Sequence, residues 1–189
     1  MIFIREVKWK DSLSKRDNNS ILHKEAHELL RENLLKYYIN DEKDILYKRN
    51  EYGKLEIINS SYNINLSYCK GMVCCGILKF NNIGIDVEYV RKYNKSLLNL
   101  VLSNDEKIDL MKAKDENEYF FRLWTLKESY IKAIGKGLSF PMKKCNFKIT
   151  QDEIITNIKG YKFKQKLITK DSEKYIISIA WEGNYELVL

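Results

Sequence analysis

Two short stretches of this chain carry charged side chains at spacings that could support chemistry. In the first, residues 83–88, apolar residues alternate with small or acidic ones, so Asp86 and Glu88 point to one side of a predicted strand together with Gly84. Two carboxylates beside a residue without a side chain leave room for a metal ion or a bulky ligand. Charged side chains on a solvated strand face would give the same pattern.

The second stretch, residues 119–141, reads YFFRLWTLKESYIKAIGKGLSFP and predicts an amphipathic helix with a Gly-rich exit. Apolar residues recur at spacings of three and four, which predicts a buried stripe made of Phe120, Leu123, Trp124, Ile131 and Ile134. A second face contains Phe121 and Thr125 and places the Glu128 carboxylate one turn before the Lys132 ammonium. An exposed Glu-Lys pair, stabilising the helix by about 0.2–0.5 kcal/mol, would have the same spacing.

Length, composition and charge indicate what kind of molecule positions these residues. A length of 189 residues with 44% hydrophobic and 12% aromatic content indicates one globular unit, or two small ones packed tightly. The net charge of +7 indicates an acidic or phosphate-bearing partner. Lysines are spread along the chain and no nucleic-acid-binding motif is present, so we expect no nucleic-acid partner.

The start of the chain and its apolar runs bear on localisation. The first residues, MIFIREVKWKD, are charged from the fifth residue and read as a strand, not a signal peptide. No apolar run approaches the roughly 20 residues of a membrane helix, so we expect no membrane partner. The four cysteines lack CxxC spacing and indicate reduced core residues of a cytoplasmic protein; they are Cys69, Cys74, Cys75 and Cys145.

Further elements are predicted by periodicity and capping residues. A first strand to Trp9 is followed by a helix that ends at Tyr38. Ser103 reads as the N-cap of a short helix, and alternating segments from Cys145 onward read as antiparallel strands. The two histidines, His23 and His27, stand four apart on the first helix, a geometry that can bind a metal but matches no zinc-protease motif.

Together the two charged stretches resemble the signature of the 4'-phosphopantetheinyl transferases. In that family a G-I-D-x-E strand is followed about forty residues later by W-[ST]-x-K-E-[SA]-x-x-K. Residues 84–88 read GIDVE, and residues 124–132 read WTLKESYIK and continue into GKGLS. The pair of motifs in this order and at this separation is specific, and it is most similar to the surfactin-type (Sfp-type) branch, whose chains fuse two similar halves.

The resemblance implies a fold and a division of the chain. The expected class is α+β, with two similar α/β halves in a pseudo-twofold arrangement, each a small antiparallel sheet packed with helices. The N-terminal half would span residues 1–90 and the C-terminal half residues 91–189. No strict sequence repeat is visible, so this architecture comes from the resemblance alone.

The resemblance also implies a reaction. A serine of an apo acyl or peptidyl carrier protein would attack the β-phosphate of coenzyme A, receive its phosphopantetheine arm and release 3',5'-ADP. Mg²⁺ held by Asp86, Glu88 and Glu128 would neutralise the pyrophosphate, since hard carboxylate oxygens suit this ion. Glu128 would also accept the serine proton, directly or through water, and Lys132 would stabilise charge on the leaving phosphate. We expect a monomer.

Further positions would bind the coenzyme. Besides Asp86 and Lys132, the resemblance assigns this role to Lys15, Lys54, Ser67 and Tyr68. Two positions depart from the family pattern: Glu28 stands where relatives carry an arginine for the 3'-phosphate, and Tyr68 stands where they carry a histidine. Because neither supplies a positive charge, a second interpretation is a transferase-like protein that binds carrier domains or nucleotides without turnover.

Overall fold

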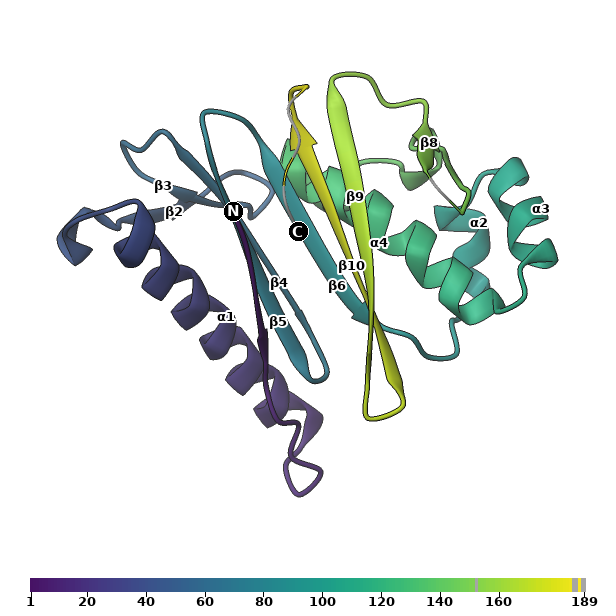
Figure 1. The fold of residues 1–189 in the computed structure, drawn as a ribbon, viewed down its shortest axis with the longest axis horizontal. Helices are drawn as coiled ribbons and strands as arrows, with labels where there is room; N and C mark the ends of the chain where they lie inside the picture. The colour runs from purple at the N-terminus through teal and green to yellow at the C-terminus, as the bar shows by residue number, and fades with distance from the viewer. Residues whose placement is uncertain (152, 185–186, 188–189) are drawn as a thin grey trace.

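The protein, described from a computed structural model over residues 1–151, 153–184 and 187, is built from two three-stranded antiparallel sheets and the helices packed on them. The first sheet has the order β1-β5-β4, formed by β1 (Ile2–Glu6), β4 (Tyr62–Cys69) and β5 (Met72–Lys79). Helix α1 (Lys15–Tyr37) packs along β4 and β5 (Figure 1).

The second sheet has the order β6-β10-β9 and carries the central helix. Its strands are β6 (Ile83–Tyr89), β9 (Tyr161–Lys170) and β10 (Glu173–Glu182), and helix α4 (Glu116–Ile134) packs on β6 and β10. Figure 1 shows α4 behind this sheet and α1 beside the first one. Strand β4 lies next to β6, although the two belong to different hydrogen-bonded sheets.

Shorter elements lie between these strands and helices along the chain. Two hairpins of three-residue strands are formed by β2 (Tyr47–Arg49) with β3 (Leu55–Ile57) and by β7 (Phe147–Ile149) with β8 (Ile154–Thr156). Helices α2 (Leu98–Val101) and α3 (Asn104–Lys112) precede α4. The 3₁₀ turns are η1 (Glu42–Asp44), η2 (Lys95–Leu97), η3 (Gly137–Ser139) and η4 (Met142–Lys144).

Capping residues set the ends of the three longer helices. The Ser14 hydroxyl accepts a hydrogen bond from the backbone N–H of Asp17 at the start of α1. Ser103 and Glu106 form a capping box at the start of α3, which confirms the predicted helix start. Helix α4 ends at Gly135, whose φ of 67° is the left-handed conformation that glycine adopts without strain.

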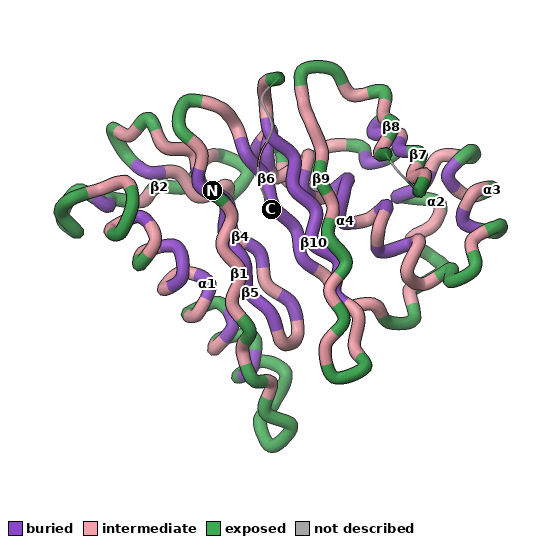
Figure 2. The backbone as a smooth tube through the Cα atoms, viewed as in Figure 1, coloured by how far each residue is buried: buried purple, intermediate pink, exposed green. Residues whose placement is uncertain are grey.

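Apolar residues form three buried clusters around the two sheets. One lies between α1 and the first sheet, one surrounds α4, and the third joins β5 to β6 and β10 between the sheets. Figure 2 shows that many buried residues lie in the central strands. The four cysteines are free and buried, as predicted from their spacing.

Helix α4 is more buried than one apolar stripe predicts. Phe120, Leu123 and Ile131 are buried as expected, whereas Trp124 and Ile134 are only half-buried. The face that carries Glu128 is covered as well, because Phe121 and Thr125 are both buried; the additional burial comes from β6 and β10, which pack on the same helix.

The predicted α+β class, with small antiparallel sheets packed with helices, is confirmed. The pseudo-twofold relation and the division at residue 90 stay predictions. Strand β6, which precedes that division, hydrogen-bonds with β10 from the end of the chain. Among the described residues no helix is both long and apolar enough to cross a membrane.

Candidate active site

Strand β6 and helix α4 meet at Gly84, and this contact brings the two predicted motifs together. A Cβ atom at Gly84 would lie 1.9 Å from the backbone oxygen of Ser129 and 2.4 Å from the backbone nitrogen of Ala133. The expectation that Gly84 leaves room for a ligand is therefore wrong, because the backbone of α4 fills that space. The glycine instead allows the close packing that places Asp86 beside the last turns of α4.

Asp86, Lys132 and Ser67 form a hydrogen-bonded cluster across three elements. The Lys132 ammonium donates to Asp86 Oδ1 at 2.6 Å and to the Ser67 hydroxyl oxygen at 2.9 Å. The Ser67 hydroxyl donates to the same Asp86 oxygen at 3.0 Å. Burial opposes the charge on Lys132, but the attraction and hydrogen bond of Asp86 outweigh it and raise the pKa of the ammonium.

The charge of the Asp86 carboxylate contributes to the pKa values of both Glu128 and Glu88. Burial, reinforced by the Asp86 carboxylate, raises the pKa of Glu128 to about 7. Burial and Asp86 also raise the pKa of Glu88, although its Oε2 accepts a hydrogen bond from Arg91 at 2.7 Å. Three carboxylates thus converge at one site, from β6 and α4.

One oxygen atom, Oδ2 of Asp86, supports the binding of a divalent cation at this site. Asp86 is 5% exposed, and its Oδ2 is buried without a hydrogen-bond partner, whereas Oδ1 is held by Lys132 and Ser67. A buried carboxylate oxygen left unpaired is costly unless a cation or donor approaches it. Within the described ranges, no group of three His, Cys, Asp or Glu side chains is arranged so that it could hold a metal ion. The ligand set Asp86, Glu88 and Glu128 is chemically suited to Mg²⁺ and stays a prediction.

A small pocket of about 210 Å³ opens beside Lys132. Its charged lining residues are Arg49, Lys54 and Lys132, and no carboxylate of the described residues lines it. Its other lining residues include Asn65 on β4 and Gly135 and Gly137 after α4. A cavity lined by three cations and no acid attracts an anionic group.

Lys54 is held at the end of α4 by a hydrogen bond from its ammonium to the backbone oxygen of Ala133 at 2.6 Å. Burial lowers the pKa of this lysine to about 8, against the opposing effect of Glu56 and Glu182. The neighbouring Asn50 side chain donates to the backbone oxygen of Gly135 at 3.0 Å. The turn between β2 and β3 therefore binds the carboxyl end of α4, where helix carbonyls lack partners.

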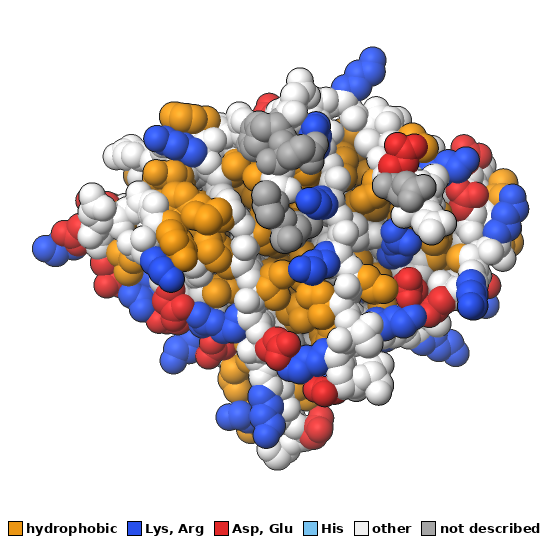
Figure 3. Space-filling view, viewed as in Figure 1, with side chains coloured by type: hydrophobic (Ala, Val, Ile, Leu, Met, Phe, Trp, Pro, Cys, Tyr) orange, Lys and Arg blue, Asp and Glu red, His pale blue; other side chains and the backbone are white. Residues whose placement is uncertain are grey.

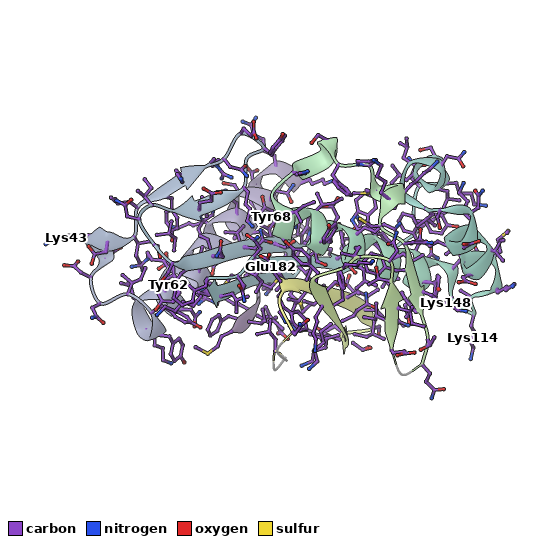
Figure 4. All side chains as sticks on the ribbon, turned by 90° about the horizontal axis from the view of Figure 1, so that it is seen from above. Lys43, Tyr62, Tyr68, Lys114, Lys148 and Glu182 are labelled. Atoms are coloured by element: carbon purple, nitrogen blue, oxygen red, sulfur yellow. The ribbon has the colours of Figure 1, made fainter. Side chains whose placement is uncertain are left out.

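Two predicted coenzyme-binding residues, Lys15 and Tyr68, make no interaction in the described part of the chain with Asp86, Lys132 or Ser67 and do not line the pocket. Tyr68 follows Ser67 on β4 and therefore points to the opposite face of the strand. There its ring packs against His23 of α1, with 6.0 Å between the ring centroids. Figure 4 shows Tyr68 near the middle of the molecule. Lys15 is the first residue of α1 and is exposed. Their coenzyme-binding role stays a prediction.

Arg31, three residues after Glu28 on the first helix, is not a free arginine. Arg31 donates to Glu28 at 2.5 Å and to Glu42 at 3.1 Å, so two carboxylates neutralise its charge. The rings of His23 and His27 lie 4.4 Å apart on the same helix. Burial, together with the charges of His23 and Arg49, lowers the pKa of His27.

Sequence reasoning missed a buried ion pair that lies directly beside Glu128. Lys127 and Glu106 are both fully buried, and the Lys127 ammonium donates to Glu106 Oε2 at 2.7 Å. The same ammonium donates to the backbone oxygens of Met142 and Cys145, and Glu106 Oε1 accepts from the N–H of Phe147. The capping box at Glu106 was the only sequence signal, because nothing local indicates its long-range partner.

Comparison with known proteins identifies proteins to which this chain is similar. The protein named 4'-phosphopantetheinyl transferase Sfp from Bacillus subtilis (strain 168) is 36% identical over 128 residues, which cover 66% of this chain and 56% of that protein. 4'-Phosphopantetheinyl transferase gsp from Aneurinibacillus migulanus is 32% identical over 142 residues, covering 74% of this chain and 56% of that protein. The crystal structure of the Thermotoga maritima holo-[acyl-carrier-protein] synthase superposes with a TM-score of 0.44 at 19% identity, covering 55% of this chain and 64% of that one.

The chain spans about half the length of the curated relatives that it matches, 56% in both cases. A family model described as the 4'-phosphopantetheinyl transferase superfamily matches residues 82–180, a range that contains Asp86, Glu88, Glu128 and Lys132. This chain belongs to the 4'-phosphopantetheinyl transferase superfamily, in its Sfp-type branch.

Proposed function

We propose that this protein transfers the 4'-phosphopantetheine arm of coenzyme A to a serine of an apo acyl or peptidyl carrier protein and releases 3',5'-ADP. The supporting observation is the contact between two motifs about forty residues apart, which gathers Asp86 from β6 with Glu128 and Lys132 from α4 beside a basic pocket. A pyrophosphate substrate needs such a mixture, because cations must offset its charge while a base takes a proton.

Each residue of the cluster has a distinct part in the proposed reaction. The carrier serine oxygen forms a bond to the β-phosphorus of coenzyme A, and the bond from that phosphorus to the bridging oxygen breaks. Glu128, whose pKa of about 7 suits proton transfer near neutral pH, accepts the serine proton. Lys132, fixed by Asp86 and Ser67, presents its ammonium to the phosphate oxygen on which the leaving electron pair settles.

Asp86, Glu88 and Glu128 would hold Mg²⁺, with the unpaired Asp86 Oδ2 as the supporting observation. When bound, the ion neutralises charge on the pyrophosphate. Lys54 and Arg49 line the adjoining pocket and would attract the phosphates of the coenzyme. We further propose that the protein acts as a monomer in the cytoplasm, which agrees with its four reduced, buried cysteines.

One assay tests the function. The protein is incubated with coenzyme A, magnesium and an apo carrier protein, and the intact mass of the carrier is measured. A gain of one phosphopantetheine group that disappears with EDTA or with a carrier whose serine is replaced by alanine is the expected result. Binding of coenzyme A or carrier without any mass gain would support the alternative, a transferase-like protein without turnover. Glu28 and Tyr68 are the residues that suggest this alternative.

A further inference from the structure

We infer that the free edge of β9 and the side chain of Arg122 form a docking groove for an extended acidic segment of a partner protein. The segment would add to the second sheet as a further strand and place one carboxylate on Arg122. The groove is a cavity of about 660 Å³ between β9 and the β7–β8 hairpin. It shares no described lining residue with the pocket beside Lys132, so the inference is independent of the proposed transfer reaction.

The residues that line this cavity show that it runs along the edge of β9. Side chains of a strand alternate between two faces, so a cavity over one face would be lined by every second residue. Residues 161–165 line this one in unbroken succession. β9 is the outer strand in the order β6-β10-β9, and β10 is its one strand partner in the described part of the chain. The other edge of β9 can therefore pair with an added strand.

The β7–β8 hairpin forms the opposite wall of the groove. Its residues Thr150, Ile154 and Thr156 line the cavity, and β8 pairs with β7 alone among the described strands. Figure 1 shows β9 between β10 and β8. Because a strand rises by roughly 3.4 Å per residue, the stretch 161–165 extends over about 17 Å and accommodates about five residues of an extended chain.

Arg122 supplies the charge that selects an acidic segment. Its Nε donates to Oε1 of Gln165 on β9 at 2.7 Å, and Gln165 Nε2 donates to the Arg122 backbone oxygen and to the Ser178 hydroxyl, both at 2.9 Å. This network fixes the guanidinium at the groove. Burial lowers the pKa of Arg122, and no carboxylate of the described residues forms an ion pair with it, since Glu118 is bound by Lys174 at 2.5 Å. A partly buried guanidinium without a counter-ion favours a ligand carboxylate, which it can bind through two parallel hydrogen bonds.

The charges around the groove favour an acidic partner over a second copy of this chain. Lys164 and Lys166 on β9 are exposed, and Glu153 is the one acid among the described residues that line the groove. Lysines on an edge strand disfavour pairing between identical edges, and two copies with a net charge of +7 repel each other. The same charges attract an acidic segment, whose alternate side chains would point to the side of Arg122.

Capped synthetic peptides that alternate valine and glutamate are the probe. One comparison peptide carries lysine in place of glutamate. Another carries proline in place of valine, so it keeps the negative charge but lacks backbone N–H groups that a strand needs. Each is titrated by calorimetry into the wild type, Arg122→Gln, Arg122→Lys and Lys36→Gln, which removes an exposed cation from α1 and is the matched control. Amide hydrogen exchange locates the bound peptide, and circular dichroism verifies that each variant is folded.

We expect the valine–glutamate peptide to bind the wild type and to slow exchange in residues 161–165, because an added strand accepts hydrogen bonds from their outward amides. Arg122→Gln should weaken this binding by about tenfold to a hundredfold, the loss for a hydrogen bond between charged groups. Arg122→Lys should weaken it less, and Lys36→Gln by less than about threefold. The lysine and proline peptides should bind at least about tenfold more weakly than the valine–glutamate peptide.

Several results would overturn the inference. Equal affinity for the proline and valine–glutamate peptides would show attraction by charge without strand addition, and slowed exchange outside β9 would place the site elsewhere. Absence of binding, or wild-type affinity in both Arg122 variants, would remove the groove or the arginine from it. A dimer in solution with β9 protected would assign the edge to a second copy, and tighter binding of a single-stranded oligonucleotide at the same residues would assign it to phosphate groups.

Discussion

Glu128 and Lys132 have the predicted spacing on the helix, but their surroundings differ from those of a surface ion pair. The sequence places them one turn apart on a helix, which alone describes a surface ion pair. In the structure the Lys132 ammonium reaches across to Asp86 and Ser67, so its main partners come from β6 and β4. Glu128 is left with raised pKa among carboxylates, which is the environment of a functional acid or base and not of a surface pair.

Replacing Glu128 should therefore separate activity from stability. Glu128→Gln keeps the shape of the side chain but removes its charge, so kcat should fall by about a hundredfold or more. The melting temperature should be maintained or raised, since one of three neighbouring carboxylates becomes neutral. Transfer kinetics and thermal unfolding check both results, with Glu116→Gln in the first turn of the same helix as control. Near wild-type turnover for Glu128→Gln would remove this residue from the mechanism.

At the scale of elements, α4 is positioned by contacts on several sides. Strand β6 approaches its backbone at Gly84, and the β2–β3 turn binds its last carbonyls through Lys54 and Asn50. The Lys127 ammonium of α4 donates hydrogen bonds to Glu106 of α3 and to the backbone oxygen of Cys145, which precedes β7. The site residues on α4 therefore depend on segments that precede the helix in the chain and on one that follows it.

The buried Lys127–Glu106 pair should show strong energetic coupling. Lys127→Met leaves the Glu106 carboxylate buried without its partner and should lower the free energy of unfolding by about 3–5 kcal/mol. Glu106→Leu alone should be similarly damaging, because the Lys127 ammonium then stays buried with only carbonyl acceptors. The double variant Lys127→Met/Glu106→Leu should recover part of this loss. Urea unfolding of all four proteins gives the coupling energy, and additive losses would contradict the assigned role.

The buried Lys54 should make stability depend on pH in one direction. Its pKa in the folded protein is about 8, below the ordinary value of 10.5, so the folded state penalises the ammonium. Between these values the unfolded chain binds more protons, and the free energy of unfolding should rise with pH from about 8 to 10.5 relative to Lys54→Met. Urea unfolding of both proteins across this range measures the difference. A difference that is constant or falls with pH would show that Lys54 is not desolvated.

The local features of this fold and the family of the chain could be predicted from the sequence, but the long-range contacts could not. Helix and strand positions follow from periodicity and from caps such as Ser103, which act over a few residues. The effect of Gly84 was predicted wrongly, because a missing side chain looks the same whether a ligand or a helix fills the space. The partners of Lys127 and Arg122 are 21 and 43 residues away, beyond any local pattern.

At the scale of the whole molecule, the net charge of +7 is distributed widely. Figure 3 shows blue Lys and Arg side chains scattered over one face and interspersed with acidic ones, so no single basic patch dominates there. The segment after β6 is nevertheless basic and leads away from Glu88. Arg91 in this segment is bound to Glu88 and lies over the ring of Phe121 at 4.6 Å, whereas Lys92 and Lys95 are exposed.

This distribution predicts where an acidic carrier protein would dock. Lys92 and Lys95 lie within seven residues of the candidate ligand Glu88, where the carrier serine must approach. Reversing both to glutamate should raise the KM for the carrier by about threefold to tenfold, as expected for two exposed ion pairs, and leave the KM for coenzyme A unchanged. The transfer rate at low carrier concentration should also fall with added salt, because the Debye length is only about 10 Å at 0.1 M.

A matched control distinguishes local docking from overall attraction. Lys36 and Lys43 are exposed on the N-terminal half, and Figure 4 shows Lys43 at the end of the molecule opposite Lys114 and Lys148. Reversing Lys36 and Lys43 changes the net charge by the same amount as reversing Lys92 and Lys95, so both variants lose equal long-range attraction. A carrier KM that rises only in the Lys92/Lys95 variant places the docking surface beside β6. Equal increases in the two variants would mean that net charge alone attracts the carrier, and the exposed Leu100 and Met111 on α2 and α3 would then be the next residues to replace.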